Sequence, residues 1–151
     1  LLTYQLNKKS DQALRFNLYK SSFKIVRSDS GILPIADLQT KSHAVLEITE
    51  KDASPNLFFE YINKYYSSIQ FEVLDTSSYQ QLTQFDRVFV MCDRDLTAFE
   101  QRLLLQLKDE TNILICFFGS EGGLEYFETF STILWHPESN PVTHKIAPQI
   151  L

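Results

Sequence analysis

Short apolar runs alternate along this chain with segments whose apolar residues recur at helical spacing. Continuous apolar runs of about four to eight residues are typical of buried strands, whereas the wider spacing is typical of amphipathic helices. The pattern predicts strands at 43–48, 69–74, 87–92, 113–118 and 132–135, and an extended piece at 23–27. The run at 113–118 (ILICFF) is the most hydrophobic, so we expect it in the middle of a sheet.

Helices are predicted between these strands, because most of the intervening segments begin with residues that start helices. The expected starts are Ser54-Pro55, Thr97 and Asn140-Pro141, and further helices are predicted at 10–22 and 120–129. The segment after 69–74 is a polar, Ser- and Gln-rich connection in which no helix is predicted. Pro148 should kink or end the last helix, because proline lacks the N–H that a helix interior needs.

The helical spacing also predicts which side chains face the core. Leu14 and Leu18 share one face of the first helix. The inward positions of the next two predicted helices are Phe58, Tyr61, Ile62 and Tyr65, and then Phe99, Leu103 and Leu107.

Strands that alternate with helices predict a fold of the α/β class. We expect a three-layer α/β/α sandwich, flavodoxin-like in appearance, with a mostly parallel sheet of about five or six strands. Residues 1–9 are expected to be a linker from an N-terminal domain, and residues 10–151 to form one domain. Functional groups of such sheets gather in the loops after the strands. Those loops are expected at 49–54, 75–78, 93–96, 119–123 and 136–140.

The composition excludes several classes of partner. A net charge of -5 gives no general attraction to a phosphate backbone, so nucleic acid is not an expected partner. No apolar run approaches the roughly 20 residues that a membrane span needs. We expect any targeting signal to lie outside this chain. The two cysteines, Cys92 and Cys116, both lie in strand-like runs and are expected to be buried small hydrophobes.

Two short motifs look like hydrolase nucleophile sites, and each lacks a required feature. Ser120 follows a predicted strand as in a nucleophile elbow, but Phe118 stands where the first glycine belongs. We instead expect Ser120 to cap a helix and Gly122-Gly123 to allow close packing. His136-Pro137-Glu138 resembles the His and Glu of class I glutamine amidotransferases. That triad would need Cys116, which lies within an apolar run and only twenty positions before His136.

Asp93-Arg94-Asp95 presents two carboxylates at the predicted sheet edge, as a metal site or an acid/base pair would. Arg94 argues against a metal, and a solvated turn with a local ion pair is the simpler interpretation. His43 and His144 have no second ligand at zinc spacing. We therefore expect neither a metal nor a cofactor.

Several segments, taken in order, resemble the C-terminal domain of glycoside hydrolase family 3 enzymes. Residues 18–35 (LYKSSFKIVRSDSGILPI) resemble a part of the family that contains a helix, an extended piece "lvLLKNe" and a loop that closes with "g-LLPL". Residues 85–90 resemble its "aDvvvv" strand, and residues 112–119 (NILICFFG) its "nvvVvlfG" strand. Residues 145–151 are similar to its following helix. The residues matched in the first segment are Ile25, Val26, Arg27, Ser28, Gly31, Ile32, Leu33, Pro34 and Ile35. Arg27 for lysine, Ser28 for asparagine and Pro148 depart from the family pattern.

The resemblance implies a two-domain hydrolase in which an N-terminal (β/α)₈ barrel, absent from this chain, carries the carboxylate nucleophile. In members of the β-glucosidase type, a long loop after the strand matched here by 87–92 supplies the acid/base glutamate. The corresponding loop of this chain, 93–96, is short and holds no glutamate. It fits the β-N-acetylhexosaminidase type, whose proton donor is a His–Asp pair in the barrel.

The resemblance therefore implies a non-catalytic domain that packs on the barrel and meets carbohydrate only through the parent enzyme. Residues in the loops at the sheet edge are candidates for lining the substrate cleft or the domain interface. They are Asp93, Arg94, Asp95, Glu121, His136 and Glu138. A free-standing flavodoxin-like binding or scaffold domain is the main alternative. An acyl-transfer hydrolase using Ser120 or Cys116 is a third.

Overall fold

A computed structural model describes residues 2–28, 41–50 and 57–151 of the chain. In chain order the elements are α1 (Leu2–Ser22), β1 (Lys24–Ser28), β2 (His43–Ile48), α2 (Leu57–Tyr65), β3 (Ser68–Phe71), α3 (Thr76–Leu82), β4 (Arg87–Cys92), α4 (Ala98–Glu110), β5 (Asn112–Phe118), the 3-10 helix η2 (Glu121–Phe127), β6 (Thr132–His136) and α5 (Pro141–Ile150). The family-matched residues Gly31, Ile32, Leu33, Pro34 and Ile35 and the predicted helix start at Ser54-Pro55 lie outside the described residues.

The strands form one sheet in the order β1-β6-β5-β4-β2-β3. All neighbouring pairs are parallel except β1 and β6, which run antiparallel. β5 and β4 lie in the middle, where both faces of a strand are covered. This arrangement confirms the mostly parallel sheet and the interior position of the run at 113–118.

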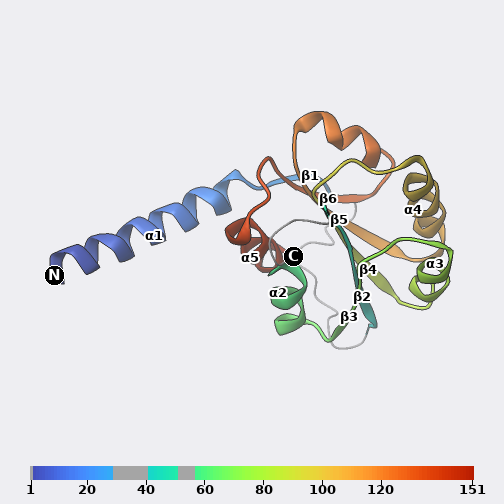
Figure 1. Ribbon diagram of the computed structural model, residues 1–151, viewed down its shortest axis with the longest axis horizontal. Helices are drawn as coiled ribbons and strands as arrows, with labels where there is room; N and C mark the ends of the chain where they lie inside the picture. The colour runs from blue at the N-terminus through green and yellow to red at the C-terminus, as the bar shows by residue number, and fades with distance from the viewer. Residues whose placement is uncertain (1, 29–40, 51–56) are drawn as a thin grey trace.

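Helices cover both faces of the sheet, which gives the three predicted layers (Figure 1). Side chains of successive residues in β4 lie on opposite faces of the sheet, because side chains alternate along a strand. Val88 and Val90 pack in a cluster with Leu104 of α4 and Phe127 of η2. On the other face, Phe89 packs with residues of α2 and α5 such as Ile62 and Ala147.

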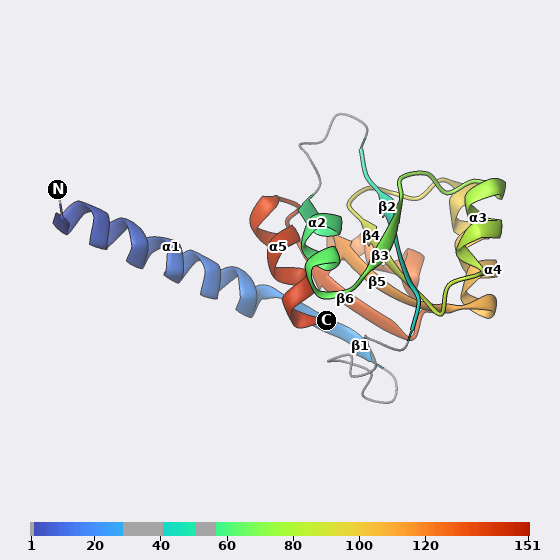
Figure 2. The same cartoon turned by 90° about the horizontal axis from the view of Figure 1, so that it is seen from below.

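The first helix is longer than the sequence predicted. It begins at Leu2, so the expectation that structure starts near Ser10 is wrong. Figures 1 and 2 show α1 leaving the body of the domain and extending away from it. Leu14 and Leu18 do share a face, but they are 59% and 57% exposed. The domain itself therefore does not bury that face.

A helix that the pattern missed, α3, occupies the polar segment after β3. Its start is fixed by Asp75, whose side chain accepts a hydrogen bond from the Ser78 backbone N–H at 2.8 Å. The Ser78 hydroxyl in turn accepts one from the Asp75 N–H at 2.9 Å. Only Leu82 and Ser78 of this helix are buried, so its apolar stripe is too narrow to be recognised from spacing.

Four details of the sequence prediction are wrong. Tyr65 and Phe99 are 53% and 47% exposed and do not face the core. Leu104 and Glu100 are buried on α4 instead, because the face that meets the sheet is rotated from the predicted one. β3 ends at Phe71, three residues before the predicted end at 74. Ser120 sits at the N-cap position of η2, but its side chain makes no capping hydrogen bond.

The last helix begins as predicted and ends differently. Asn140 caps α5, with its side-chain oxygen accepting hydrogen bonds from the N–H groups of Val142 and Thr143, both at 3.0 Å. Pro148 does not end the helix, which continues to Ile150. Pro148 has no N–H to donate, so the helix lacks one backbone hydrogen bond there. Its ring is buried in the interior of the domain. None of the described helices is long and apolar enough to cross a membrane.

Candidate functional site

All six candidate residues lie where the parallel strands end. Asp93, Arg94 and Asp95 follow β4, Glu121 lies in η2 after β5, and His136 ends β6. Glu138 comes two residues later. Because parallel strands end at one edge of the sheet, the topology brings these loops together, as the sequence predicted. The side chains, however, belong to separate local networks.

Arg94 is held by three neighbouring segments. Its Nη1 and Nη2 atoms donate to the two carboxylate oxygens of Glu100 at 2.9 and 2.8 Å, which is a bidentate ion pair. Its Nε donates to the carbonyl of Thr49 at 3.1 Å, and Nη1 also donates to that of Asp95 at 2.9 Å. The guanidinium thus ties the end of β2 to the β4–α4 loop and to α4.

Glu100 is committed to the same structural unit. Besides binding Arg94, its carboxylate accepts a hydrogen bond from the Thr97 N–H at 2.9 Å, and its own N–H donates to the Thr97 hydroxyl at 3.1 Å. This reciprocal pair is a capping box, and it begins α4 at Thr97, where the sequence predicted a helix start. The hydrogen bond with Arg94 holds the pKa of Glu100 below its usual range. Glu100 is therefore an ionised structural carboxylate and not a poised proton donor.

A second network joins the loops after β4 and β6 across the end of β5. The Ser139 hydroxyl donates to the Asp93 carboxylate at 3.0 Å and lies 2.8 Å from Nε2 of His144 on α5. With the hydroxyl proton on the Asp93 side, Nε2–H of His144 is the donor to Ser139. The order is Asp–Ser–His, which differs from a Ser–His–Asp triad, where the histidine lies between the serine and the carboxylate.

Burial shifts the pKa values at both ends of this network. It raises the pKa of Asp93, and it lowers the pKa of His144 to about 4. His144 is 7% exposed and packs edge-on against Phe118, with ring centroids 5.3 Å apart. The imidazole is consequently neutral at physiological pH.

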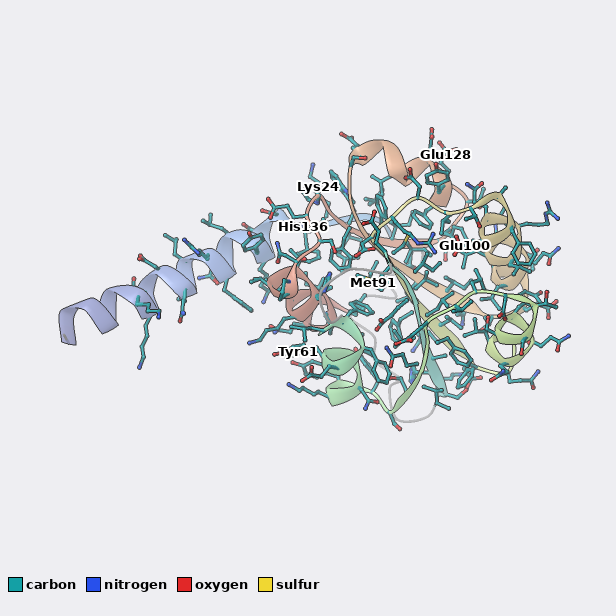
Figure 3. All side chains as sticks on the ribbon, in the orientation of Figure 1. Lys24, Tyr61, Met91, Glu100, Glu128 and His136 are labelled. Atoms are coloured by element: carbon teal, nitrogen blue, oxygen red, sulfur yellow. The ribbon has the colours of Figure 1, made fainter. Side chains whose placement is uncertain are left out.

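His136 lies on the side of the domain where α1 joins the body, as Figure 3 shows. Its ring is 2% exposed and packs against Phe23 and Tyr19, at centroid distances of 4.7 and 5.7 Å. Nδ1 accepts a hydrogen bond from the Glu138 N–H at 3.0 Å. Desolvation lowers the pKa of this imidazole, so His136 is a neutral packing residue.

The remaining candidates are exposed and are not joined to one another. Asp95 and Glu121 point to solvent. Glu138 accepts a hydrogen bond from the Asn140 side-chain amide at 3.3 Å. Within the described residues, none of these carboxylates belongs to a group of three or more His, Cys, Asp or Glu side chains able to hold a metal.

Ser139 and His144 also belong to this edge, and the sequence pattern did not predict their roles. No spacing signal marks Ser139, because its two partners lie on other elements and are brought near only by the fold. His144 was considered only as a zinc ligand. A cavity of about 500 Å³ at the same edge is lined by Arg94, Glu100, Glu47, Glu50 and Glu72. Its acidic lining is unsuited to a phosphate or another anion.

The cysteines and Ser120 lack the features of nucleophiles. Burial raises the pKa of Cys92 to about 12 and raises that of Cys116 further above its ordinary value. Both are free and buried, as predicted. Ser120 is exposed at the start of η2, and no hydrogen bond from its hydroxyl to a histidine or a carboxylate is seen among the described residues.

Comparison with known proteins gives a match at the level of fold. No family model and no curated protein sequence matches this chain. One solved structure with this fold is a fungal multi-domain family 3 β-N-acetylglucosaminidase that contains a GCN5-related glucosamine N-acetyltransferase region. Its TM-score is 0.80 and its sequence identity is 20%. The match covers 94% of this chain and 18% of the fungal chain. A family 3 β-N-acetylglucosaminidase from Paenibacillus shares the fold with a TM-score of 0.73 and 14% sequence identity. The match covers 90% of this chain and 30% of the Paenibacillus chain.

A β-glucoside phosphorylase also shares the fold, with a TM-score of 0.70 and 15% identity over 93% of this chain and 29% of its own. This chain thus spans less than a third of the length of each of these three solved structures. The chain accordingly has the fold of one segment of family 3 glycoside hydrolase chains.

Proposed function

We propose that the chain is the non-catalytic C-terminal domain of a family 3 glycoside hydrolase. In this proposal it packs on a catalytic (β/α)₈ barrel that lies outside these 151 residues. The fold shared with segments of much longer enzyme chains supports the proposal. It also favours this function over a free-standing scaffold domain, because the matching segments belong to multi-domain or larger chains.

The observation that carries the non-catalytic assignment is the short loop after β4. It contains Asp93, Arg94 and Asp95, and α4 begins at Ala98. Arg94 is bound to Glu100, and Asp93 is bound to Ser139. A general acid needs a carboxyl group with a raised pKa that also reaches the leaving group. Burial raises the pKa of Asp93, but its carboxylate is bound by Ser139 within the domain. The glutamate nearest this loop, Glu100, has a lowered pKa.

The loop also supports the β-N-acetylhexosaminidase type over the β-glucosidase type. A domain that donates the acid/base glutamate needs a long loop to reach the active site of the barrel, and this loop is only a few residues long. We infer that the barrel of the parent enzyme supplies both the nucleophile and the proton donor.

In the parent enzyme, the six candidate residues have auxiliary roles. Exposed Asp95, Glu121 and Glu138 are proposed to line the cleft or the domain interface, where they meet carbohydrate hydroxyls or the barrel. Arg94 and His136 are proposed to hold the edge in shape, as their contacts with Glu100 and Phe23 indicate. Asp93 does the same through Ser139.

An activity comparison tests this function. The 151-residue chain and the longer polypeptide that includes sequence before Leu1 are assayed on aryl N-acetyl-β-glucosaminide and aryl β-glucoside. The proposal predicts that only the longer polypeptide turns over substrate and that it prefers the N-acetylated sugar. Turnover by the 151-residue chain contradicts the non-catalytic role. Preference for the glucoside contradicts the enzyme type.

A further inference from the structure

The helix α1 carries an uncovered face as well as a packed one. Phe16 and Tyr19 are half-buried, and the Tyr19 ring contacts His136. At 3.6 residues per turn, Leu14 and Leu18 lie on roughly the opposite side of the helix. Both leucines are more than half exposed. The helix is therefore apolar on two sides, and only one of them meets the domain.

A long part of α1, residues 8–15, has no support from the domain. Residues 8–15 are all exposed, and Figures 1 and 2 show this part of the helix standing clear of the body in two perpendicular views. Helices gain most of their stability from packing of an apolar face and are marginal in water when isolated. A 21-residue helix with this exposure needs a covering surface over residues 8–15.

The charge of α1 is opposite to that of the rest of the chain. Its charged residues are Lys8, Lys9, Arg15 and Lys20 against Asp11, a net charge of +3 in a chain of net charge -5. The other residues thus carry a net charge of -8. Next to Arg15, a groove of about 450 Å³ between α1, Leu57 and the start of α5 adds a further cation, Lys145. The covering surface should therefore be apolar at its centre and acidic around it.

We propose that the outer surface of α1, defined by Leu14, Leu18 and the flanking basic side chains, docks against the catalytic domain that precedes this chain. This inference rests on the proposed function. A catalytic domain in the same polypeptide would have an effective concentration in the millimolar range, which a second copy of the chain does not reach in dilute solution.

Limited trypsin proteolysis of the longer polypeptide tests the docking, because α1 contains four basic cleavage sites. Cleavage after Arg15, followed by mass spectrometry, should be at least about tenfold slower in the longer polypeptide than in the 151-residue chain. The double variant Leu14→Glu/Leu18→Glu should restore fast cleavage in the longer polypeptide. Leu105→Glu, at a 43% exposed leucine of α4, is the matched control and should leave the protection unchanged.

Two further readouts separate the outcomes. The double variant should not change the melting temperature of the 151-residue chain, because both positions are exposed and glutamate is a good helix former. Equal cleavage rates in the two polypeptides, or protection that survives the double variant, overturn the docking. If the longer polypeptide is an active glycosidase in those cases, the proposed function still stands. A dimer of the 151-residue chain that the double variant dissociates would assign the surface to a second copy and overturn the inference.

Discussion

Arg94 is the residue whose side chain connects most segments of the sheet edge. Replacing it with methionine should leave the buried Glu100 carboxylate paired only with Thr97. We expect Arg94→Met to lower the free energy of unfolding by about 2 kcal/mol, between the values typical of exposed and buried pairs. Urea denaturation measures the effect. Arg102→Met is a control at an exposed cation of α4 and should change the free energy of unfolding by less than about 0.5 kcal/mol.

His144 should make the domain sensitive to mild acid. Its pKa in the folded state is about 4, below the ordinary value of about 6.5. As pH falls from 6.5 toward 4, the unfolded chain binds a proton that the folded chain does not, so stability falls by up to about 3 kcal/mol. The raised pKa of Asp93 acts in the opposite direction, because its folded state gains a proton first.

The variant His144→Gln isolates this contribution. Glutamine keeps a hydrogen-bonding group near Ser139 and does not ionise. The difference in unfolding free energy between pH 7 and pH 4, measured by urea denaturation, should be smaller in the variant by about 2–3 kcal/mol. An identical pH dependence in the two proteins would show that His144 is not buried as described.

Residue-level chemistry was predictable only where it is local in sequence. The Thr97–Glu100 capping box lies within three positions and follows from the residue types alone. The pairing of Asp93 with Ser139 spans 46 positions and depends on β4 and β6 flanking β5. No sequence spacing encodes that contact, so a loop expected to be a solvated turn is instead part of a network.

At the scale of elements, the turn after β5 depends on one of its two adjacent glycines. A Cβ atom at Gly123 would lie 2.4 Å from the Phe117 ring, whereas one at Gly122 would meet nothing within 4 Å. Phe117 is 4% exposed and packs against Phe127, so it has little room to move. Gly123→Ala should cost about 1–3 kcal/mol of stability, and Gly122→Ala less than about 0.5. Thermal unfolding compares the pair, and equal effects would contradict the packing of η2.

The start of α5 depends on Asn140 in a similar way. Asn140→Ala leaves two backbone N–H groups without their acceptor and should lower stability by about 1 kcal/mol. Asn140→Ser retains a capping oxygen and should recover most of that loss. Chemical denaturation distinguishes the two. If Asn140→Ala does not lower the free energy of unfolding, the N-terminal turn of α5 is not held by its cap.

The elements that the pattern predicted well are those with wide apolar faces. β4 and β5 are buried on both sides and were placed within one residue of their ends. α3 was missed because it buries little, and the extent of α1 was missed because its first half has no apolar periodicity to reveal it. Tyr65 and Phe99 show that helical spacing alone does not fix which side of a helix meets the sheet.

At the scale of the whole molecule, the topology explains why candidate residues gather without forming an active site. Five parallel strands bring their loops to one edge, which is where enzymes of this class place their chemistry. Here Arg94 binds Glu100 and Asp93 binds Ser139, while the remaining candidate carboxylates are exposed and separate from one another. The fold class and the location of the edge followed from the alternation of strands and helices, but the structural use of its charges did not.

The central claim is that this domain contributes no catalytic group. The most direct test measures kcat of the longer polypeptide on an aryl N-acetyl-β-glucosaminide for Asp93→Asn, Asp95→Asn, Glu121→Gln and Glu138→Gln. Each should keep kcat within about tenfold of the unsubstituted enzyme. Loss of a general acid or base costs typically about 10²–10⁴-fold. A fall of that size in any correctly folded variant would show that this domain carries part of the catalytic machinery.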